Sequence, residues 1–215
     1  MLSDLVPQRF LELAGADGSR TLCWTFHHAL LDGWSCARLM QELGAELAGK
    51  PVPAAGATPA DFQRWLAGRD REVSRAFWQA ELAGLAGPTR LAPQRGAPAA
   101  ALTRIDRCLA GEDYQRLTRM AGAVRVTIGT LVQAALGLAL ARRTGAPEAV
   151  FGTVVSGRPA DLEGIEEAVG LFINAVPVLV TDRRAQSVRD WLAELQERRT
   201  AAGEHEHLPL TEAAR

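Results

Sequence analysis

One stretch of the chain decides how the rest is interpreted: residues 26–35 read Phe26-His27-His28-Ala29-Leu30-Leu31-Asp32-Gly33-Trp34-Ser35. Just before it, apolar and polar side chains alternate, which predicts a β-strand over residues 21–28. Neighbouring side chains of a strand point to opposite faces, so we expect His27 and His28 to face apart. Residues 29–33 then predict a tight turn in which Gly33 adopts a positive φ angle.

This pattern can carry acid–base chemistry. An imidazole at the end of a strand is a natural general base, because its unperturbed pKa lies close to neutral pH. Asp32 lies four residues after His28, a spacing that suits a group holding the loop and the ring better than it suits a base or a ligand. For an isolated His-His doublet, the structural alternative is a pair of core histidines with satisfied hydrogen bonds.

The composition is that of a globular protein and argues against a broad surface for binding nucleic acid or membranes. Of the 215 residues, 47% are hydrophobic and 23% are charged, and 24 basic against 25 acidic residues leave a net charge of −1. This excludes a broad basic surface, and no apolar run is long enough to span a bilayer. Cys23, Cys36 and Cys108 form no CxxC pair, which favours free thiols and a cytoplasmic location.

The rest of the chain mixes helical and strand patterns, and one segment divides it. Residues 84–101, GLAGPTRLAPQRGAPAAA, predict a linker between residues 1–83 and residues 102–215. Strands are expected at 102–109, 149–156 and 176–181. We therefore expect an α/β (α+β) fold of mixed sheets packed with helices. The expected helices are at 34–48, two short ones within 58–82, and 112–121, 127–145 and 187–202.

Four further blocks follow the HHALLDG stretch of residues 27–33. They are TPADFQRW (58–65), FGTVVSGRP (151–159), VGLFINAVP (169–177) and HLPL (207–210). Together the five blocks resemble the condensation domains of nonribosomal peptide synthetases, which are relatives of chloramphenicol acetyltransferase. Residues 27–33 match the HHxxxDG signature of that family at every fixed position. In the block of residues 58–65, the tyrosine usual in the family ahead of the Asp61-Phe62 pair is missing.

The resemblance implies two chloramphenicol-acetyltransferase-like lobes and a condensation reaction. Two carrier proteins each present a thioester on a phosphopantetheine arm, one from either side of a tunnel between the lobes. The amine of the acceptor aminoacyl group attacks the donor carbonyl, an amide forms, and the donor thiol leaves. The implied partners are the donor and acceptor carrier proteins and an adjacent adenylation domain, and no cofactor or metal is bound directly.

The same resemblance assigns roles to single residues. His28 lies at the reaction centre, where it accepts the amine proton or holds the amine in line, and Asp32 braces the loop through a salt bridge with an arginine. The candidate catalytic set also contains His27, in a structural role, and Gly33, whose backbone N–H is a candidate oxyanion donor. The candidate substrate-channel residues are Asn174, Trp34 and Ser35, and the candidate structural support is Arg158. For Asn174, a structural role in capping a strand break before Pro177 stays open.

The chain also departs from the family. Members are much longer, and motifs of the first lobe such as SxxQxR and RHExLR are absent here. We therefore expect a fragment of a larger synthetase that lacks the N-terminal and C-terminal parts, so that both lobes are incomplete. The family's arginine partner for Asp32 belongs to the missing RHE-type motif. Either Arg158 or another arginine replaces it, or the carboxylate is left unpaired.

Three alternatives stay open from the sequence. A truncated domain of this kind can be catalytically silent and only dock carrier proteins. Other HHxxxDG acyltransferases and epimerisation domains share the signature. A metal site would use the chain's four histidines, two of them in His205-Glu206-His207, but joint ligation by His27 and His28 is disfavoured because they are expected to face apart.

Overall fold

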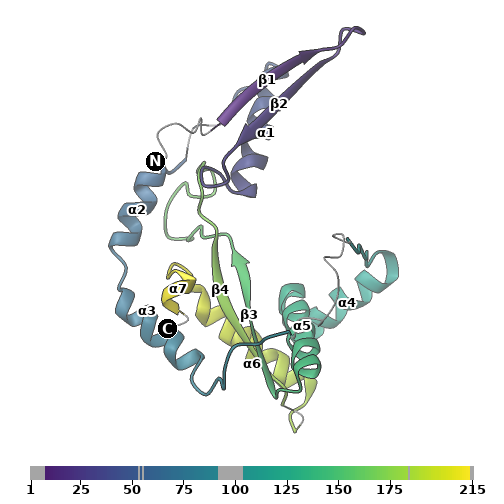
Figure 1. The fold of residues 1–215 in the computed structure, drawn as a ribbon, viewed down its shortest axis with the longest axis vertical. Helices are drawn as coiled ribbons and strands as arrows, with labels where there is room; N and C mark the ends of the chain where they lie inside the picture. The colour runs from purple at the N-terminus through teal and green to yellow at the C-terminus, as the bar shows by residue number, and fades with distance from the viewer. Residues whose placement is uncertain (1–7, 53, 55, 92–103, 184, 214–215) are drawn as a thin grey trace, which may run out of the picture. The chain divides into compact units, whose positions relative to one another are not determined.

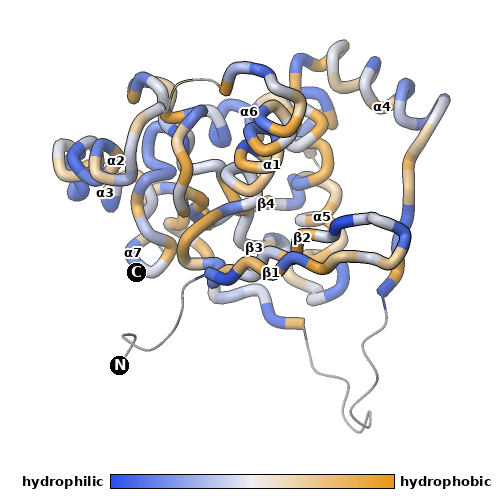
Figure 2. The backbone as a smooth tube through the Cα atoms, turned by 90° about the horizontal axis from the view of Figure 1, so that it is seen from above, coloured by the Kyte–Doolittle hydropathy of each residue, from blue (hydrophilic) through white to orange (hydrophobic). Residues whose placement is uncertain are grey.

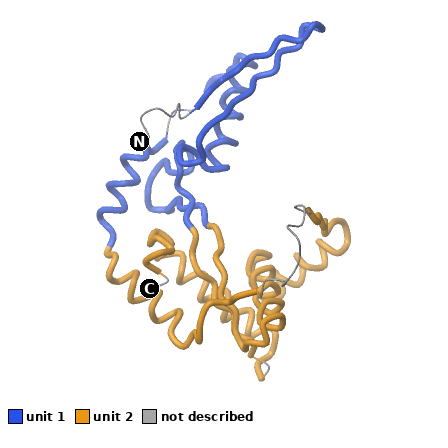
Figure 3. The backbone as a smooth tube through the Cα atoms, in the orientation of Figure 1, with its two compact units in different colours: residues 1–69, 155–174 blue, residues 70–154, 175–215 orange. Residues whose placement is uncertain are grey.

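The structure, a computed structural model, describes residues 8–52, 54, 56–91, 104–183 and 185–213, which form two compact units (Figures 1 and 3). Unit 1 consists of Met1–Arg69 and Val155–Asn174, and unit 2 of Asp70–Val154 and Ala175–Arg215. The predicted lobe boundaries, 1–83 and 102–215, stay a prediction. Residues 92–101 of the predicted linker lie outside the described residues.

Helices and two-stranded sheets make up both units, which confirms the mixed α/β class. Hydrophilic and hydrophobic residues, blue and orange in Figure 2, are interspersed along the helices. The elements in chain order are β1 (Gln8–Ala14), β2 (Arg20–Phe26), α1 (Gly33–Leu47), α2 (Pro59–Ala67), α3 (Arg71–Glu81), α4 (Gly111–Val124), α5 (Ile128–Thr144), β3 (Glu148–Val155), β4 (Asn174–Thr181), α6 (Val188–Gly203) and α7 (Leu210–Ala213).

In unit 1, β1 and β2 form an antiparallel ribbon. Phe10 pairs with Trp24 across it, and their rings stack with centroids 5.7 Å apart. Helix α2 begins at a capping box, in which Thr58 and Asp61 satisfy each other's backbone N–H groups and Pro59 opens the first turn. The predicted start of this helix is therefore confirmed.

One predicted strand is present but ends earlier than expected, and another is wrong. β2 ends at Phe26, so His27 and His28 follow the strand instead of belonging to it. The alternation argument, which put the two histidines on opposite faces, therefore does not apply to them. The described part of the predicted strand 102–109, residues 104–109, contains no strand.

The part of unit 1 between β3 and β4 runs as turns and extended chain. It packs through Ile165, Ala168 and Phe172, and the ring of Phe62 in α2 meets Phe172 edge-on at 5.1 Å. Gly157 has a φ of 64°, and a Cβ at this position would lie 1.7 Å from the carbonyl oxygen of Phe172. Only glycine allows this approach of the two backbones.

In unit 2 the core is built on β4, whose residues 176–180 are all buried. Val178 and Val180 pack with Ala134 of α5 and with Leu192 of α6. Gly137 lets α5 approach closely, because a Cβ there would lie 2.3 Å from the Cβ of Val180. Among the described residues, no single helix is long and apolar enough to cross a membrane. The pair α4 and α5 meets that criterion only when joined, and the two are bent by 98°.

Candidate active site

Asp32 caps the start of α1. Its backbone is extended, with φ −94° and ψ 174°, and its Oδ1 accepts a hydrogen bond from the backbone N–H of Ser35 at 2.8 Å. This satisfies a free N–H group of the first turn and places a negative charge at the positive end of the helix dipole. Gly33 is the first helical residue and has no positive φ. A turn is present at residues 28–30, but the positive φ predicted for Gly33 is wrong, because the helix begins at this glycine.

Arg158 is the ionic partner of Asp32. Its Nη1 donates to Oδ2 of the carboxylate at 2.8 Å, and its Nη2 lies 3.3 Å from Oδ1. The two side chains are 3% and 0% exposed, respectively. The backbone N–H of Phe172 donates a further hydrogen bond to Oδ2 at 3.1 Å. An arginine between β3 and β4 thus supplies the partner whose identity the sequence left open.

These contacts keep Asp32 ionised. Burial alone raises the pKa of a carboxyl group. Here the hydrogen bonds from Arg158 and from the backbone N–H groups of Ser35 and Phe172 outweigh burial and lower the pKa of Asp32 to about 2. A buried carboxylate whose oxygens are already occupied is unsuited to accept a proton from a substrate near neutral pH. Its contacts instead join the start of α1 to the segment between β3 and β4.

The hydroxyl of Ser35 belongs to the same network. Ser35 is 0% exposed; its Oγ donates to the carbonyl of Gly170 at 2.8 Å and accepts from the N–H of Gly170 and from Nη2 of Arg158, both at 3.0 Å. The backbone N–H of Asp32 also donates to the carbonyl of Gly170, at 3.1 Å. The sequence placed Ser35 in a substrate channel, whereas the structure buries its hydroxyl in this network.

Both motif histidines are exposed and lie in the turn after β2. The Nδ1 of His27 accepts a hydrogen bond from the N–H of Ala29 at 3.1 Å, and its carbonyl accepts one from the N–H of Leu30 at 3.0 Å. His27 thereby shapes the turn. Four residues after His28 the chain reaches the buried Asp32, so the turn is anchored while the His28 side chain stays open to solvent.

The other two predicted channel residues lie beside the network. Trp34 is 51% exposed, and its indole N–H donates to the carbonyl of Glu166 at 2.9 Å. Asn174 is half-buried and is the first residue of β4. Because Phe172, two residues earlier, donates to Asp32, the network connects the start of α1 to the start of the strand that carries Asn174.

Sequence reasoning missed the backbone groups of this site. Gly170 and Phe172 contribute N–H and carbonyl groups, and the carbonyl of Ala168 accepts from Arg158 at 3.3 Å. Backbone groups leave no residue-type signal. The sequence offered one indication: residues 169–177 form one of the blocks that resemble the family. That block assigned the whole segment to the site without showing which of its groups take part.

The alternative metal site has no support in the described part of the chain. There, no group of three or more His, Cys, Asp or Glu side chains is placed to hold a metal ion. In unit 2, Nδ1 of His205 and Nε2 of His207 lie 3.1 and 3.2 Å from the hydroxyl oxygen of Ser74. These two imidazoles therefore converge on a hydroxyl that joins them to α3.

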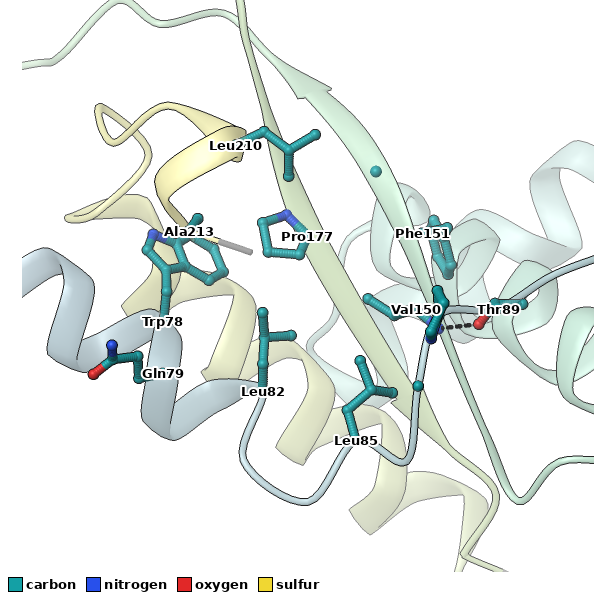
Figure 4. A pocket seen from close by; sticks show the side chains of 13 residues that line it. Trp78, Gln79, Leu82, Leu85, Thr89, Val150, Phe151, Pro177, Leu210 and Ala213 are labelled. Atoms are coloured by element: carbon teal, nitrogen blue, oxygen red, sulfur yellow. Dashed lines mark hydrogen bonds between the residues drawn. The ribbon is translucent and has the colours of Figure 1, made fainter. Parts of the chain in front are cut away.

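Unit 2 also contains an apolar cavity of about 670 Å³ (Figure 4). No charged side chain lines it, and none of the candidate site residues does. Trp78 and Leu82 of α3 face Pro177 of β4 and Leu210 of α7 across it. The cavity suits apolar groups and shares no residue with the network around Asp32.

Comparison with known sequences identifies the family. The family model described as Condensation domain matches residues 3–214. This chain belongs to the condensation domain family. It is 38% identical over 223 aligned positions to chondramide synthase cmdD of Chondromyces crocatus and 34% identical over 205 positions to bacitracin synthase 1 of Bacillus licheniformis. The alignments cover 100% and 92% of this chain but only 6% and 4% of those proteins.

Solved structures show the same fold. The chain matches the crystal structure of holo T3CT with a TM-score of 0.71 and 26% identity, covering 97% of this chain and 46% of that chain. It matches the X-domain complex with OxyB from teicoplanin biosynthesis with a TM-score of 0.74 and 27% identity, covering 99% and 51%. The chain therefore spans about half the length of these structures.

Proposed function

We propose that this condensation domain chain forms amide bonds in nonribosomal peptide biosynthesis, as part of a larger synthetase. The observation that carries the proposal is the exposed imidazole of His28 four residues before the buried Asp32–Arg158 pair. The ion pair fixes the end of the turn, and the imidazole stays accessible to a substrate. A general base needs both properties: a fixed position and access to the proton it takes.

The proposed reaction joins two carrier-bound thioesters. The free amine of one aminoacyl group attacks the thioester carbonyl of the other, so that a C–N bond forms and the C–S bond breaks. His28 takes the proton that the amine loses and returns it to the departing thiolate. Holding the two groups in line lowers the barrier, and proton transfer through His28 contributes about 10²–10⁴-fold.

We assign the remaining candidate residues by their surroundings. Asp32 and Arg158 position the turn, as their burial supports, and do not touch the substrate. A Cβ at Gly33 would meet no atom within 4 Å, so packing does not require a glycine there. We attribute the glycine to a close approach of the substrate, whose developing oxyanion its N–H would bind. Trp34 and Asn174 are proposed to contact the arm or the acyl group.

The proposed partners are a donor and an acceptor carrier protein, whose phosphopantetheine arms bring the substrates, and an adjacent adenylation domain. Relatives named as peptide synthases, such as bacitracin synthase 1, support this. We place the chain in the cytoplasm, because Cys23, Cys36 and Cys108 are free thiols and disulfide formation is rare in that compartment.

The test supplies this chain with two carrier proteins, each loaded with an aminoacyl thioester, and measures the dipeptidyl thioester by mass spectrometry. We expect His28→Ala to lower the rate by about 10²–10⁴-fold, and the pH–rate profile with a poorly nucleophilic amine to lose one titrating group. His205→Ala, which removes a histidine of unit 2 outside the candidate site, is the matched control. Equal rates for wild type and His28→Ala would exclude the proposed role of His28.

A second candidate function is docking without catalysis. One matched structure is a complex of the X-domain with OxyB, so a protein of this fold occurs as the binding partner of another protein. This function predicts that the chain binds carrier proteins with unchanged affinity in wild type and His28→Ala, and that neither forms product. Product formation by the wild type would exclude it.

A further inference from the structure

We propose that Ser35 is a positioning residue that keeps the turn carrying His28 in register with the segment carrying Asn174. Both segments belong to unit 1. The hydroxyl of Ser35 bonds α1, which follows the turn, to Gly170, which lies four residues before Asn174. The effect of Ser35 on catalysis rests on the proposed function. The relative position of His28 and Asn174 does not depend on that function and can be measured separately.

The hydroxyl of Ser35 uses its complete hydrogen-bonding capacity. A serine hydroxyl offers one donor and two acceptor lone pairs. Here the donor goes to the carbonyl of Gly170, and the lone pairs accept from the N–H of Gly170 and from Arg158. All three bonds cross from α1 to the segment between β3 and β4. At 0% exposure, no water replaces them without rearrangement.

At Ser35, the backbone hydrogen bond that caps α1 can be separated from the hydroxyl hydrogen bonds that join α1 to the segment between β3 and β4. The contact that caps α1 uses the backbone N–H of Ser35, which any residue except proline retains. Arg158 also keeps its bonds to Asp32 when the hydroxyl is removed. Ser35→Ala therefore removes only the three hydrogen bonds of the hydroxyl. The buried N–H of Gly170 then lacks its acceptor, which favours movement of the segment between β3 and β4.

Besides the contacts of Arg158 with Ala168 and of Trp34 with Glu166, bonds at Gly170 and Phe172 hold the end of the segment that leads into β4. Gly170 is held by the hydroxyl of Ser35 and by the N–H of Asp32, and Phe172 is held by the carboxylate of Asp32. Asn174 follows two residues later. Without the hydroxyl, the anchor at Gly170 keeps one bond out of three, so the position of Asn174 relative to the His28 turn is less defined.

The first experiment needs no activity. NMR spectra of the full chain are recorded for wild type, Ser35→Ala and the matched control Ser74→Ala. Ser74 is also a buried serine, 1% exposed, whose hydroxyl contacts His205 and His207 in unit 2. We expect Ser35→Ala to shift or broaden the side-chain amide signals of Asn174 and the ring signals of His28, and Ser74→Ala to leave them in place. Unchanged signals in Ser35→Ala, or equal changes in both variants, would overturn the proposal.

The second experiment measures dipeptide formation with both carriers. We expect kcat of Ser35→Ala to fall roughly 10–100-fold, because misplacement of reacting groups acts on the rate, with KM for each loaded carrier within about twofold and Ser74→Ala near wild type. A fall confined to KM would contradict positioning. Absence of product from the wild type refutes the proposed function instead, and the NMR result then decides on Ser35. If Ser35→Ala does not fold, Ser35→Cys, which fills the site with weaker donor and acceptor groups, takes its place in both assays.

Discussion

Replacing Asp32 by asparagine tests the physical basis of the site, because it removes one charge and nearly preserves the shape. The asparagine oxygen can still accept from the N–H of Ser35. Its amide nitrogen then faces the N–H of Phe172 and the Nη1 of Arg158, which are both donors. Arg158, 3% exposed, keeps its charge without a counter-charge.

The expected loss of stability follows from this burial. Removing one partner of a buried ion pair costs about 3–5 kcal/mol, a large part of the roughly 5–15 kcal/mol that stabilises a domain. The matched control is Asp161→Asn. Asp161 pairs with Arg69, but its side chain is 58% exposed, so the loss should stay below about 1 kcal/mol.

Urea denaturation at pH 7 compares the two variants through the midpoint and the slope, and amide exchange of Ser35 and Phe172 reports on the site itself. Asp32→Asn should lower the midpoint far more than Asp161→Asn and speed exchange at both amides. Adding Arg158→Met to Asp32→Asn removes the stranded charge and should recover part of the loss. Equal midpoints for the two single variants would refute the reasoning that the buried pair organises unit 1.

Two further predictions use the same unit. The pKa of Asp32, about 2, lies below its usual 3.8, so its stabilising contribution, about 2 kcal/mol, is present above pH 5 and lost as the pH falls towards 2. The free energy of unfolding, measured for wild type and for Asp32→Asn as the pH is lowered, tests this, because the variant should not show the loss of stability. Gly157→Ala should destabilise by more than about 1 kcal/mol, because its φ is 64° and a Cβ would meet the carbonyl of Phe172. Gly33→Ala, with open space and no positive φ, should fold as wild type does, and equal melting temperatures of the two glycine variants would contradict this.

The helices were predictable because their signals are local. Thr58 with Asp61, and Thr127 and Ser187, are side chains that cap within three residues of their own position, so the sequence alone predicts where α2, α5 and α6 begin. The end of β2 was not predictable in this way. The last described pair of β2 joins Phe26 to Gln8 of β1, and the periodicity of one strand carries no information about how far its partner pairs with it.

The sequence indicated side chains of the candidate site but not how they pair. The motif marks His28 and Asp32, and the resemblance drew attention to Arg158. That Arg158 is the partner of Asp32 could not be derived, because the chain has 23 arginines and the pair is 126 residues apart. The burial of Ser35 was also missed. Its hydroxyl bonds to backbone groups of Gly170, and no residue type in the sequence reveals a backbone partner.

The distance along the chain between Asp32 and Arg158 has a consequence for biosynthesis. At about 5–20 residues per second, the ribosome needs roughly 6–25 s to add the 126 positions that separate them. Throughout this interval Arg158 has not been synthesised, so the Asp32 carboxylate interacts only with water and with its own helix. Unit 1 therefore matures after most of unit 2 has been translated, and a delay between the two codons prolongs its exposure to chaperones and proteases.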